Sequence, residues 1–459
     1  MGKYRCLFFV TALCILASCA KEERFSSDGF GPSDMAKGFG HGYHANVFMV
    51  PAPSGDDDTQ NLLNTIALAQ DQGPGSVVQF QKGTYLISFM HIYGFNGTIK
   101  GAGKEKTIIK PIHALPCEPE YEKSAETVSL ISFYGGDIKL SDLSFKIDDG
   151  MICATDHGMY AGDLYSLIKF TNSLPEHTYC KSDVENVDFE GGRDDSGGND
   201  RFNTIVAIWD GFDFGAASAG NERANTDLMT SKCTFKYFGT ALDIAGLGGG
   251  NKVVKDNTFN YCDAPLLIFD IINTSGLIIN NEFESNNWFD VLIDNTDYSE
   301  YGYYTYHPQE KVTSFKISGN VIKTDKLQEG VFIYPKGISM YLMDHRRTMH
   351  PEENLAMKFL VENNRFDLGR DVTGIVGHNN KDAMILANKF MGEGVTGISL
   401  DGENGAYSLN NKILGNKFSM ADYETDIYLG EYTGNCLVAG SPIANIVNEG
   451  VNNHITGNR

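Results

Sequence analysis

Along the body of the chain, apolar and polar residues alternate in short runs, such as PLLIFDII, SGLIINNEF and TGISLDG. Gly, Asn and Asp separate these runs. A period of two is that of β-strands, and the separating residues are typical of turns. Helical periodicity is absent from this part of the chain. The pattern therefore predicts an all-β protein built from short strands joined by turns.

A recurring apolar position divides the chain into repeats. Three of its steps are 24 residues long, one is 28, and the others run from 39 to 46. A constant step with variable additions predicts one structural unit per repeat, with the additions as loops. Three short strands per unit, with like residues stacked on successive units, build a parallel β-helix. The position is held by Phe145, Phe189, Phe235, Phe259, Phe283, Ile322, Phe366, Phe390 and Phe418.

An Asn precedes most of these positions by two residues, as in LANKF and LGNKF. We expect it at a tight bend, where it tolerates a left-handed backbone and bonds neighbouring amides in a ladder. The Phe then points inward and stacks on its equivalents. Cys233 takes the place of the Asn in one repeat, and we expect it to be buried and unpaired. The Asn residues are Asn257, Asn281, Asn320, Asn364, Asn388 and Asn416.

A solenoid needs its ends covered. The segment DDDTQNLLNTIALAQDQ begins with Asp caps and places Leu62, Leu63, Ile66 and Ala69 on one helical face. It predicts a capping helix at about 58–71 that covers the first turn.

Together with GSVVQFQKGTYLI and GTIKGAGKEKTIIKP, this segment resembles the N-terminal part of the pectate-lyase-like right-handed β-helix proteins. The resemblance implies a right-handed, single-stranded parallel β-helix over residues 46–459 and a polysaccharide substrate. Gly101 and Gly103 are interpreted as a turn, because no helix follows them as it would after a phosphate-binding loop.

Residues 1–19 have the pattern of an export signal, with Lys3 and Arg5 before an apolar run that ends in small residues. The final LASC resembles the lipobox of bacterial lipoproteins, and the following AKEER resembles the surface-export tag of the Bacteroidota. The resemblance implies lipidation of Cys19, a tether over 20–45 and a place on the outer membrane surface. No later stretch reaches the roughly 20 apolar residues of a bilayer span.

The net charge of −22 argues against nucleic acid or anionic lipid as the main partner. We expect a monomer that meets the membrane only through its lipid. The cysteines after Cys19 match no metal motif by their spacing, and their pairing stays open. They are Cys117, Cys153, Cys180, Cys233, Cys262 and Cys436.

In the family that the chain resembles, the substrate groove runs along the strand that follows the Phe turn. Alternation assigns the outward positions of that strand to Tyr134, Lys169, Asp210, Asp243, Asp270, Asp294, Tyr334, Lys336, His378 and Asp401.

Four successive turns then present an Asp, about 4.8 Å apart, where like charges repel by roughly 1 kcal/mol in water. Three outcomes stay open: the carboxylates of Asp210, Asp243, Asp270 and Asp294 bind Ca²⁺, one of them has a raised pKa and acts as an acid, or they spread into water.

Long insertions lie beside the same strand, at 148–165, 191–202, 211–226, 297–311 and 341–357. Aromatic rings stack on sugars, and Arg binds carboxylates with two hydrogen bonds. Alternatively, the Arg residues of the last insertion pair with nearby Glu. The candidate substrate-binding residues are Lys169, Trp209, Tyr303, Tyr306, Tyr334, Arg346 and Arg347.

The leading functional hypothesis is β-elimination on a uronic-acid glycan, which needs a neutralised carboxylate and a base. Lys336 or His378 is the candidate base, and Asp270 and Asp294 are further catalytic candidates. The alternative is glycoside hydrolysis by paired carboxylates, suggested by NTD at 295–297 and GH at 377–378, which look like fragments of the polygalacturonase signature. The DD and RIK elements of that signature are missing. A third possibility is a surface protein that binds glycans without catalysis.

Overall fold

The computed structural model describes residues 46–113, 128–149, 151, 165–172, 179–192, 206–211, 226–245, 249–269, 271–284, 286, 288–296, 308–324, 337–353, 355–403, 405–420, 425–441 and 444–457. They belong to one compact unit, Asn46–Arg459. Among them, no helix is long and apolar enough to cross a bilayer. The signal, lipobox and tether expected over 1–45 lie outside the described residues.

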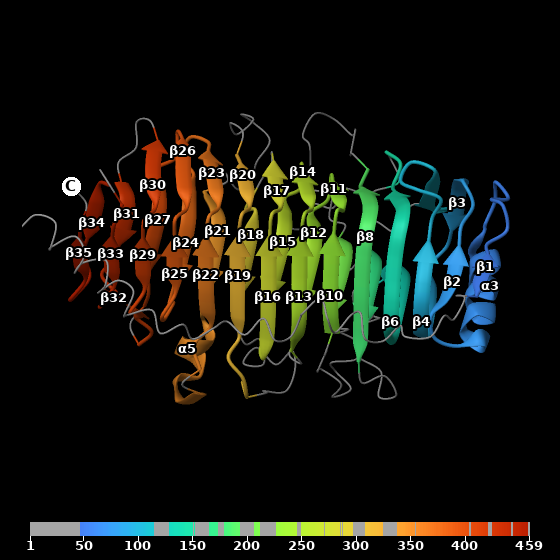
Figure 1. Ribbon diagram of the computed structural model, residues 1–459, viewed down its shortest axis with the longest axis horizontal. Helices are drawn as coiled ribbons and strands as arrows, with labels where there is room; N and C mark the ends of the chain where they lie inside the picture. The colour runs from blue at the N-terminus through green and yellow to red at the C-terminus, as the bar shows by residue number, and fades with distance from the viewer. Residues whose placement is uncertain are drawn as a thin grey trace, which may run out of the picture. The chain divides into compact units, whose positions relative to one another are not determined.

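The unit is a right-handed parallel β-helix, as the sequence predicted. Each turn contributes three short strands, and each strand pairs in parallel with its equivalents one turn before and one turn after. Figure 1 shows the strands stacked side by side, in chain order from the N-terminal to the C-terminal end. We name the three faces sheets I, II and III, in the order in which a turn visits them.

Sheet I contains β1 (Val47–Met49), β2 (Ser76–Gln79), β10 (Thr226–Ser231), β13 (Gly250–Lys255), β16 (Thr274–Ile279), β19 (Ser314–Ser318), β22 (Lys358–Glu362), β25 (Met384–Leu386), β29 (Lys412–Leu414), β33 (Leu437–Ala439) and β35 (His454–Thr456). Sheet II contains β3 (Gly83–Ile87), β5 (Thr107–Pro111), β11 (Thr234–Lys236), β14 (Thr258–Asn260), β17 (Glu282–Glu284), β20 (Val321–Lys323), β23 (Arg365–Leu368), β26 (Lys389–Gly392) and β30 (Lys417–Met420).

Sheet III contains β7 (Tyr165–Thr171), β9 (Val206–Gly211), β12 (Thr240–Ala245), β15 (Ala264–Phe269), β18 (Val291–Asp294), β21 (Ile338–Met343), β24 (Thr373–His378), β27 (Thr396–Asp401), β31 (Thr425–Leu429) and β34 (Ile446–Asn448). The long strands β4 (Met90–Lys100), β6 (Val128–Lys146) and β8 (Cys180–Glu190) bend across more than one face. The short strands β28 (Ser408–Leu409) and β32 (Thr433–Gly434) form a separate pair.

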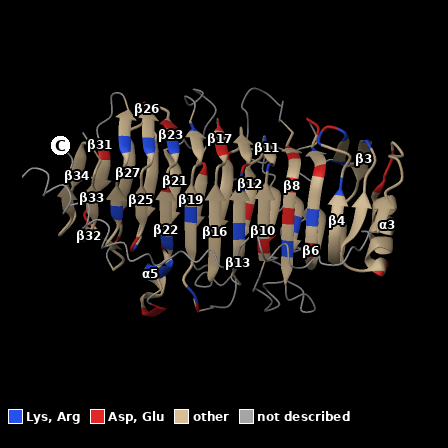
Figure 2. Cartoon of the chain, in the orientation of Figure 1, with Lys and Arg blue, Asp and Glu red and all other residues tan. Residues whose placement is uncertain are grey.

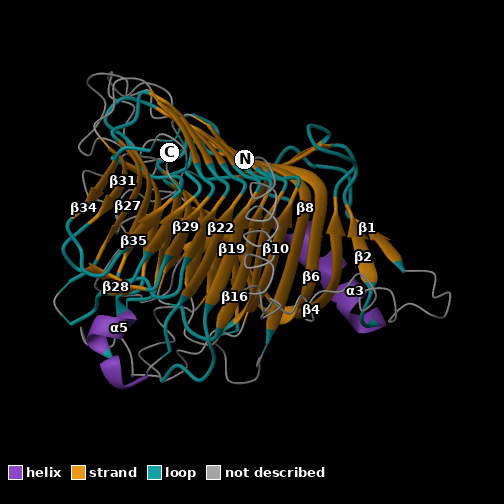
Figure 3. Ribbon diagram, turned by 60° about the vertical axis from the view of Figure 1, so that its left-hand side comes forward, coloured by secondary structure: helices purple, strands orange, loops and turns teal. Residues whose placement is uncertain are grey.

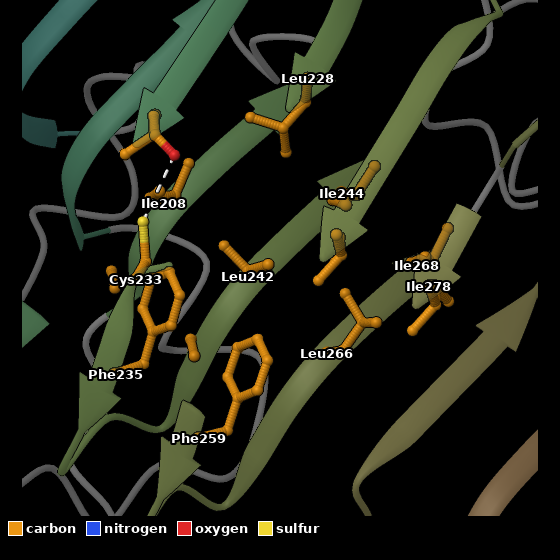
Figure 4. Packing of buried hydrophobic residues seen from close by; sticks show 14 of the residues in the cluster. Ile208, Leu228, Cys233, Phe235, Leu242, Ile244, Phe259, Leu266, Ile268 and Ile278 are labelled. Carbon is orange, nitrogen blue, oxygen red and sulfur yellow. Dashed lines mark hydrogen bonds between the residues drawn. The ribbon is translucent and has the colours of Figure 1, made fainter. Parts of the chain in front are cut away.

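The recurring Phe residues form a stack in the core, as expected. Phe189, Phe235, Phe259 and Phe283 follow one another with ring centroids 4.8 to 5.0 Å apart. Figure 4 shows Phe235 and Phe259 on neighbouring turns among aliphatic side chains of the other faces. The spacing matches the distance of about 4.8 Å between paired strands, so the strand pairing itself sets the ring stacking.

The Asn ladder is also confirmed. The Asn320 N–H donates to Oδ1 of Asn364 at 2.9 Å, and the Asn364 N–H donates in the same way to Asn388 at 2.9 Å. The left-handed residue is not the Asn itself but its predecessor, such as Ala387 with φ of 52° and Gly415 with φ of 64°. The second residue of LANKF and LGNKF therefore makes the bend, and the Asn satisfies the amides around it.

Cys233 occupies the ladder position of its turn and is buried and free, as expected. Its N–H donates to Oδ1 of Asn257, while its thiol bonds the carbonyl of Val184 at 3.3 Å. A thiol lacks the Oδ1 with which an Asn would accept the backbone N–H of the preceding turn. The ladder of side-chain amides therefore begins at Asn257.

The N-terminal end is covered by helix α3 (Thr59–Gln72), close to the predicted range. Leu62, Ile66 and Ala69 are buried and Leu63 packs against the core from its edge. Figure 3 places α3 at the end of the solenoid next to β1 and β2. The expected turn at Gly101 and Gly103 is confirmed, since strand β5 follows it.

On the outer surface, several Lys side chains form ion pairs with Asp or Glu on a neighbouring turn. Figure 2 shows basic and acidic bands distributed over the strands. Lys146 pairs with Glu190 at 3.0 Å, and Lys316 pairs with Glu362 at 2.8 Å. Each such pair contributes little because water screens it. Together they reduce like-charge repulsion between the turns that they join.

We predict that Asn364→Ala lowers the free energy of unfolding by about 3 kcal/mol, because buried groups of two neighbouring turns lose their partners. Its Oδ1 accepts from the N–H and the amide of Asn320, and its own amide donates to Ile317 O. Urea unfolding followed by circular dichroism measures the change. The exposed Asn64→Ala serves as control, and equal midpoints for the two variants would contradict the ladder's contribution.

Candidate functional site

One outward column of sheet III brings several predicted residues together. Asp294 is in register with Met343, Met343 with His378, and His378 with Asp401. The residues just before them on the same strands, including Ile293 and Leu400, belong to the core. Side chains alternate along a strand, so this column faces outward. We call it the outer column.

The expected row of four Asp on successive turns is wrong. Asp210 is in register with the core residues Phe170 and Ile244, so it faces inward. Asp243 is in register with Trp209, and Asp294 lies on the outer column. The three residues thus occupy three different columns, because the strands start at different distances from the repeat's Phe. Asp270 lies outside the described residues.

Asp210 is instead part of a buried ion pair. Lys252 Nζ lies 2.5 Å from Asp210 Oδ2 and also bonds Oγ1 and the carbonyl of Thr226, at 2.6 and 2.7 Å. Asp210 is fully buried and Lys252 is 3% exposed. A carboxylate neutralised in this way has no role in binding an external ion.

The residues assigned to calcium therefore do not fit that role as a set. Among the described residues, no group of three or more His, Cys, Asp or Glu side chains could hold a metal ion. The carboxylate of Asp294 is occupied by other donors, as described below. No step of the chemistry proposed here runs through a metal.

Two predicted substrate-binding residues lie on an outward column but are fully buried. Lys169 and Trp209 are in register on neighbouring turns and each is 0% exposed. The Lys169 ammonium lies 5.7 Å from the centre of the Tyr134 ring. Neither residue is accessible to a glycan in this structure.

Residues 331–336 of the strand expected at 331–337 lie outside the described residues. In that turn the sheet III strand is β21, from Ile338 to Met343, and its outward residues are Tyr341 and Met343. The positions given to Tyr334 and Lys336 are thus taken by other side chains. Tyr303, Tyr306, Tyr334 and Lys336 lie outside the described residues.

Asp294 binds His345, a residue of the insertion at 341–357 that was not among the predicted site residues. Nδ1 of His345 lies 3.1 Å from Oδ1 and 3.3 Å from Oδ2 of Asp294. Thr296 fixes the same carboxylate, through its N–H at 3.1 Å and its hydroxyl at 2.7 Å. Since Nδ1 is held by Asp294, Nε2 is the nitrogen left to act on a ligand, and it bonds no other described residue.

The rings of His345 and His378 lie 5.7 Å apart at 69°. The hydrogen bond with Asp294 raises the pKa of His345, whereas burial, followed by the nearby charge of His345, lowers the pKa of His378. The ring nitrogens of His378 bond no other residue in the described part of the chain. The two shifts in pKa therefore favour a protonated His345 beside a neutral His378.

His345 does not sit on a strand, so its position depends on the segment after β21. Buried Asp344 accepts from the amide of Asn295 at 2.7 Å and from the N–H of Met357 at 2.9 Å. Burial raises the pKa of Asp344 to about 6. The side-chain Oδ1 of Asn295 in turn accepts from the N–H of Arg346 at 3.1 Å. These contacts tie His345 to the turn that carries Asp294.

Arg346 begins the short helix α5 (Arg346–Met349), which is followed by η4 (Pro351–Glu353). Its Nε and Nη2 bond both carboxylate oxygens of Glu353 at 2.6 and 2.8 Å, and it is 2% exposed. The proposed substrate contact of Arg346 is therefore wrong, and the alternative of an Arg–Glu pair holds for it.

Only one nitrogen of the Arg347 guanidinium group is hydrogen-bonded within the described residues. Its Nη1 donates to the carbonyls of Asn379 and Tyr407, the second at 3.1 Å. Its Nε and Nη2 bond no other described residue. The side chain is half-buried, and its anchor Asn379 directly follows His378. Arg347 thus presents a fixed cation beside the histidine pair.

A carboxylate that sequence reasoning missed lies beside the two rings. Oε1 of Glu403 accepts from Thr348 at 2.8 Å and from the amide of Asn379 at 3.0 Å, and these bonds lower its pKa. Its position two residues after Asp401 on the same turn was the only signal in the sequence. Its negative charge stabilises a protonated imidazole nearby.

The comparisons with known proteins identify no family. No family model and no curated protein sequence match the chain. Among solved structures, it is similar to the A-module of the mannuronan C-5 epimerase AlgE6 of Azotobacter vinelandii, at 12% identity, a TM-score of 0.39, and coverage of 89% of this chain and 98% of that chain.

A GH87 α-1,3-glucanase of Streptomyces thermodiastaticus is similar at 14% identity and a TM-score of 0.45, with coverage of 91% of this chain and 70% of that chain. The surface adhesin PfbA of Streptococcus pneumoniae is similar at 15% identity and a TM-score of 0.44, with coverage of 90% of this chain and 91% of that chain. At these identities and scores the similarities decide neither substrate nor reaction.

We predict that Asp294→Asn lowers the pKa of His345 toward its ordinary 6.5, because the neutral amide no longer favours the imidazolium. NMR of the ¹³C-labelled imidazole carbons over a pH series measures it. A raised pKa in the folded state stabilises the protein below pH 6.5, and this contribution is lost as the pH rises through that pKa. Asp401→Asn is the control and should leave the His345 titration in place.

Proposed function

We propose that this protein is a polysaccharide lyase that cleaves a uronic-acid glycan by β-elimination. The observation that carries the proposal is the pair of outward imidazoles, His345 and His378, 5.7 Å apart with pKa values moved in opposite directions. Such a pair is typical of an acid and a base that work on the same substrate.

In this proposal neutral His378 removes the proton on C5 of the sugar. The electrons of that C–H bond form the double bond between C4 and C5, and the bond from C4 to the glycosidic oxygen breaks. Nε2–H of protonated His345 donates to the leaving oxygen, while Asp294 holds the imidazole through Nδ1. The products are an unsaturated uronate and a new chain end.

The same chemistry needs a cation at the sugar carboxylate, because the proton leaves from the carbon beside it. Nη1 of Arg347 is anchored on the carbonyl of Asn379, the residue after His378, and its Nε and Nη2 bond no other described residue. Arg347 replaces Lys336 and calcium as the group we assign to this task. Arg binds carboxylates in a planar, two-point geometry, which suits a fixed sugar orientation.

An extended substrate is supported by the outer face itself. Toward the N-terminal end of the solenoid, Tyr93 on β4 is in register with Tyr134 on β6, is 51% exposed, and stacks on it with ring centres 5.1 Å apart. Exposed aromatic rings bind the apolar faces of sugars. The outer column runs along the solenoid axis, as a long glycan chain would.

Glycoside hydrolysis has less support. Asp294 is already bound to His345 and Thr296, and it lies three turns from Asp401 on the outer column. Three turns separate the strands by about 14 Å, beyond the roughly 6.5–9.5 Å of an inverting carboxylate pair. A non-catalytic glycan binder remains the third possibility.

The test uses protein lacking residues 1–19 with polygalacturonate, alginate, glycosaminoglycans and a neutral glycan, with and without EDTA. Ultraviolet absorbance of the unsaturated uronate and reducing ends should rise together on an acidic glycan. Reducing ends without absorbance would favour the hydrolase. No product on any glycan from folded protein would favour the binder.

We predict that His378→Ala lowers kcat by about 10²- to 10⁴-fold, the usual contribution of a general base. Initial rates of absorbance increase measure it. His454→Ala, which removes an exposed imidazole on β35, is the matched control. Full activity of the His378 variant would contradict its role as base.

We also predict a bell-shaped pH dependence of kcat/KM. Activity falls at low pH as His378 gains a proton, with a limb below pH 6.5, and falls at high pH as His345 loses one, with a limb above pH 6.5. Asp294→Asn should move the alkaline limb to lower pH and leave the acid limb nearly unchanged. A profile in which Asp294→Asn moves neither limb would argue against the assignment.

A further inference from the structure

Three cationic side chains form a column on sheet II that breaks the charge pattern of the protein. Arg365 on β23 is in register with Lys389 on β26, which is in register with Lys417 on β30. Each precedes an inward Phe, so each points outward, and all three are exposed. Figure 2 shows the three basic bands side by side on adjacent strands. We call these residues the basic column.

The usual arrangement on this protein is different. On the turns before, Lys323 reaches Glu282 at 2.5 Å, and Lys139 reaches Glu185 at 3.0 Å, so opposite charges meet across turns. Within the described part of the chain, Lys389 and Lys417 form no ion pair. Arg365 approaches only Asp367, at 4.0 Å, with both side chains about half exposed.

Stacked like charges repel each other, and a structural surface gains nothing from them. They are stacked here in a protein of net charge −22. A polyanion is repelled by most of such a surface and can approach only where the local charge is positive. The basic column is therefore a place where an anionic chain can make several contacts in sequence.

We propose that the basic column binds a polyanionic glycan that carries one carboxylate on each sugar. The column offers one cation per turn, about 4.8 Å apart, and one pyranose ring in an extended glycan has a comparable length. Successive carboxylates can thus meet successive turns. The class of glycan is taken from the proposed function, on which this inference rests, and the basic column adds a second surface that binds it.

Nucleic acid fits this surface less well. Duplex DNA carries one charge per about 1.7 Å of its axis, far denser than one cation per turn. The column holds three cations only, and the next outward positions of β23, β26 and β30 are Asp367, Met391 and Ser419. An anionic glycan matches both the spacing and the modest charge.

The basic column and the candidate site share turns. Arg365 and His378 lie on one turn, and Lys389 and Asp401 lie on the next, each cation on sheet II and each site residue on sheet III. A long polymer held on the column therefore covers the same turns that carry the site on sheet III. Such tethering raises the local concentration of cleavable segments without any new contact at the site.

The experiment compares wild type with R365Q/K389Q/K417Q and with K82Q/K106Q/K311Q, which removes three exposed, dispersed Lys and gives the same net charge. Affinity electrophoresis in gels containing polygalacturonate, dextran or single-stranded DNA measures binding over a series of salt concentrations. Circular dichroism checks that both variants fold. His378→Ala is included, so that binding is read without cleavage.

We expect the column variant to bind polygalacturonate about 3- to 100-fold more weakly than wild type at low salt, and the dispersed variant to bind like wild type. Added salt should remove the difference, and dextran should not bind to the column. On short oligosaccharides the column variant should keep wild-type kcat, while its KM rises on long polymer.

The proposal is overturned if the column variant and the dispersed variant bind polygalacturonate equally, or if single-stranded DNA binds more tightly than polygalacturonate. Its failure is distinguishable from failure of the proposed function. If the column variant binds more weakly while wild type cleaves no glycan, the column proposal stands and the lyase proposal fails. If wild type and the column variant cleave substrates of every length equally and bind polygalacturonate equally, the lyase proposal stands and the column proposal fails.

Discussion

The hydrogen-bonded register between successive turns is the constraint on which this structure depends. It determines which side chain lies above and below every other one. The Phe rings repeat at 4.8 to 5.4 Å because the strands do, and the Asn ladder repeats one bond of 2.8 to 3.0 Å from turn to turn. Insertions of very different length leave both stacks in place, since they enter between strands and not within them.

The same register governs where charge can reside. On the outside it brings several Lys side chains next to Glu on a neighbouring turn. Inside the solenoid it places Lys252 against Asp210, so that the buried carboxylate is neutralised. Outer groups that depart from this pairing are therefore informative. Two of them are His378, whose ring nitrogens bond no other described residue, and the basic column of sheet II, and both lie on turns of the C-terminal half.

The histidine pair depends on a residue that lies outside the regular strands of the solenoid. Strand positions are spaced by the turn, so two strand residues meet only at fixed distances. His345 reaches its place beside His378 because a non-strand segment folds back onto the turn of Asp294. Asn295, Asp344 and the Arg346–Glu353 pair secure that segment. Burying these polar groups is costly unless each is bonded, and here they bond one another.

The sequence by itself determined the solenoid, the inward Phe stack, the Asn ladder and the capping helix, because each is encoded in local period and repeat. It also identified Asp294 and His378 as outward residues. It could not identify the Asp294–His345 pair or the buried state of Lys169 and Trp209. It misplaced Asp210, which faces the core. Those features depend on where each strand begins after an irregular insertion, and a shift of one residue turns a side chain from the surface to the core. Only the tertiary structure decides that shift.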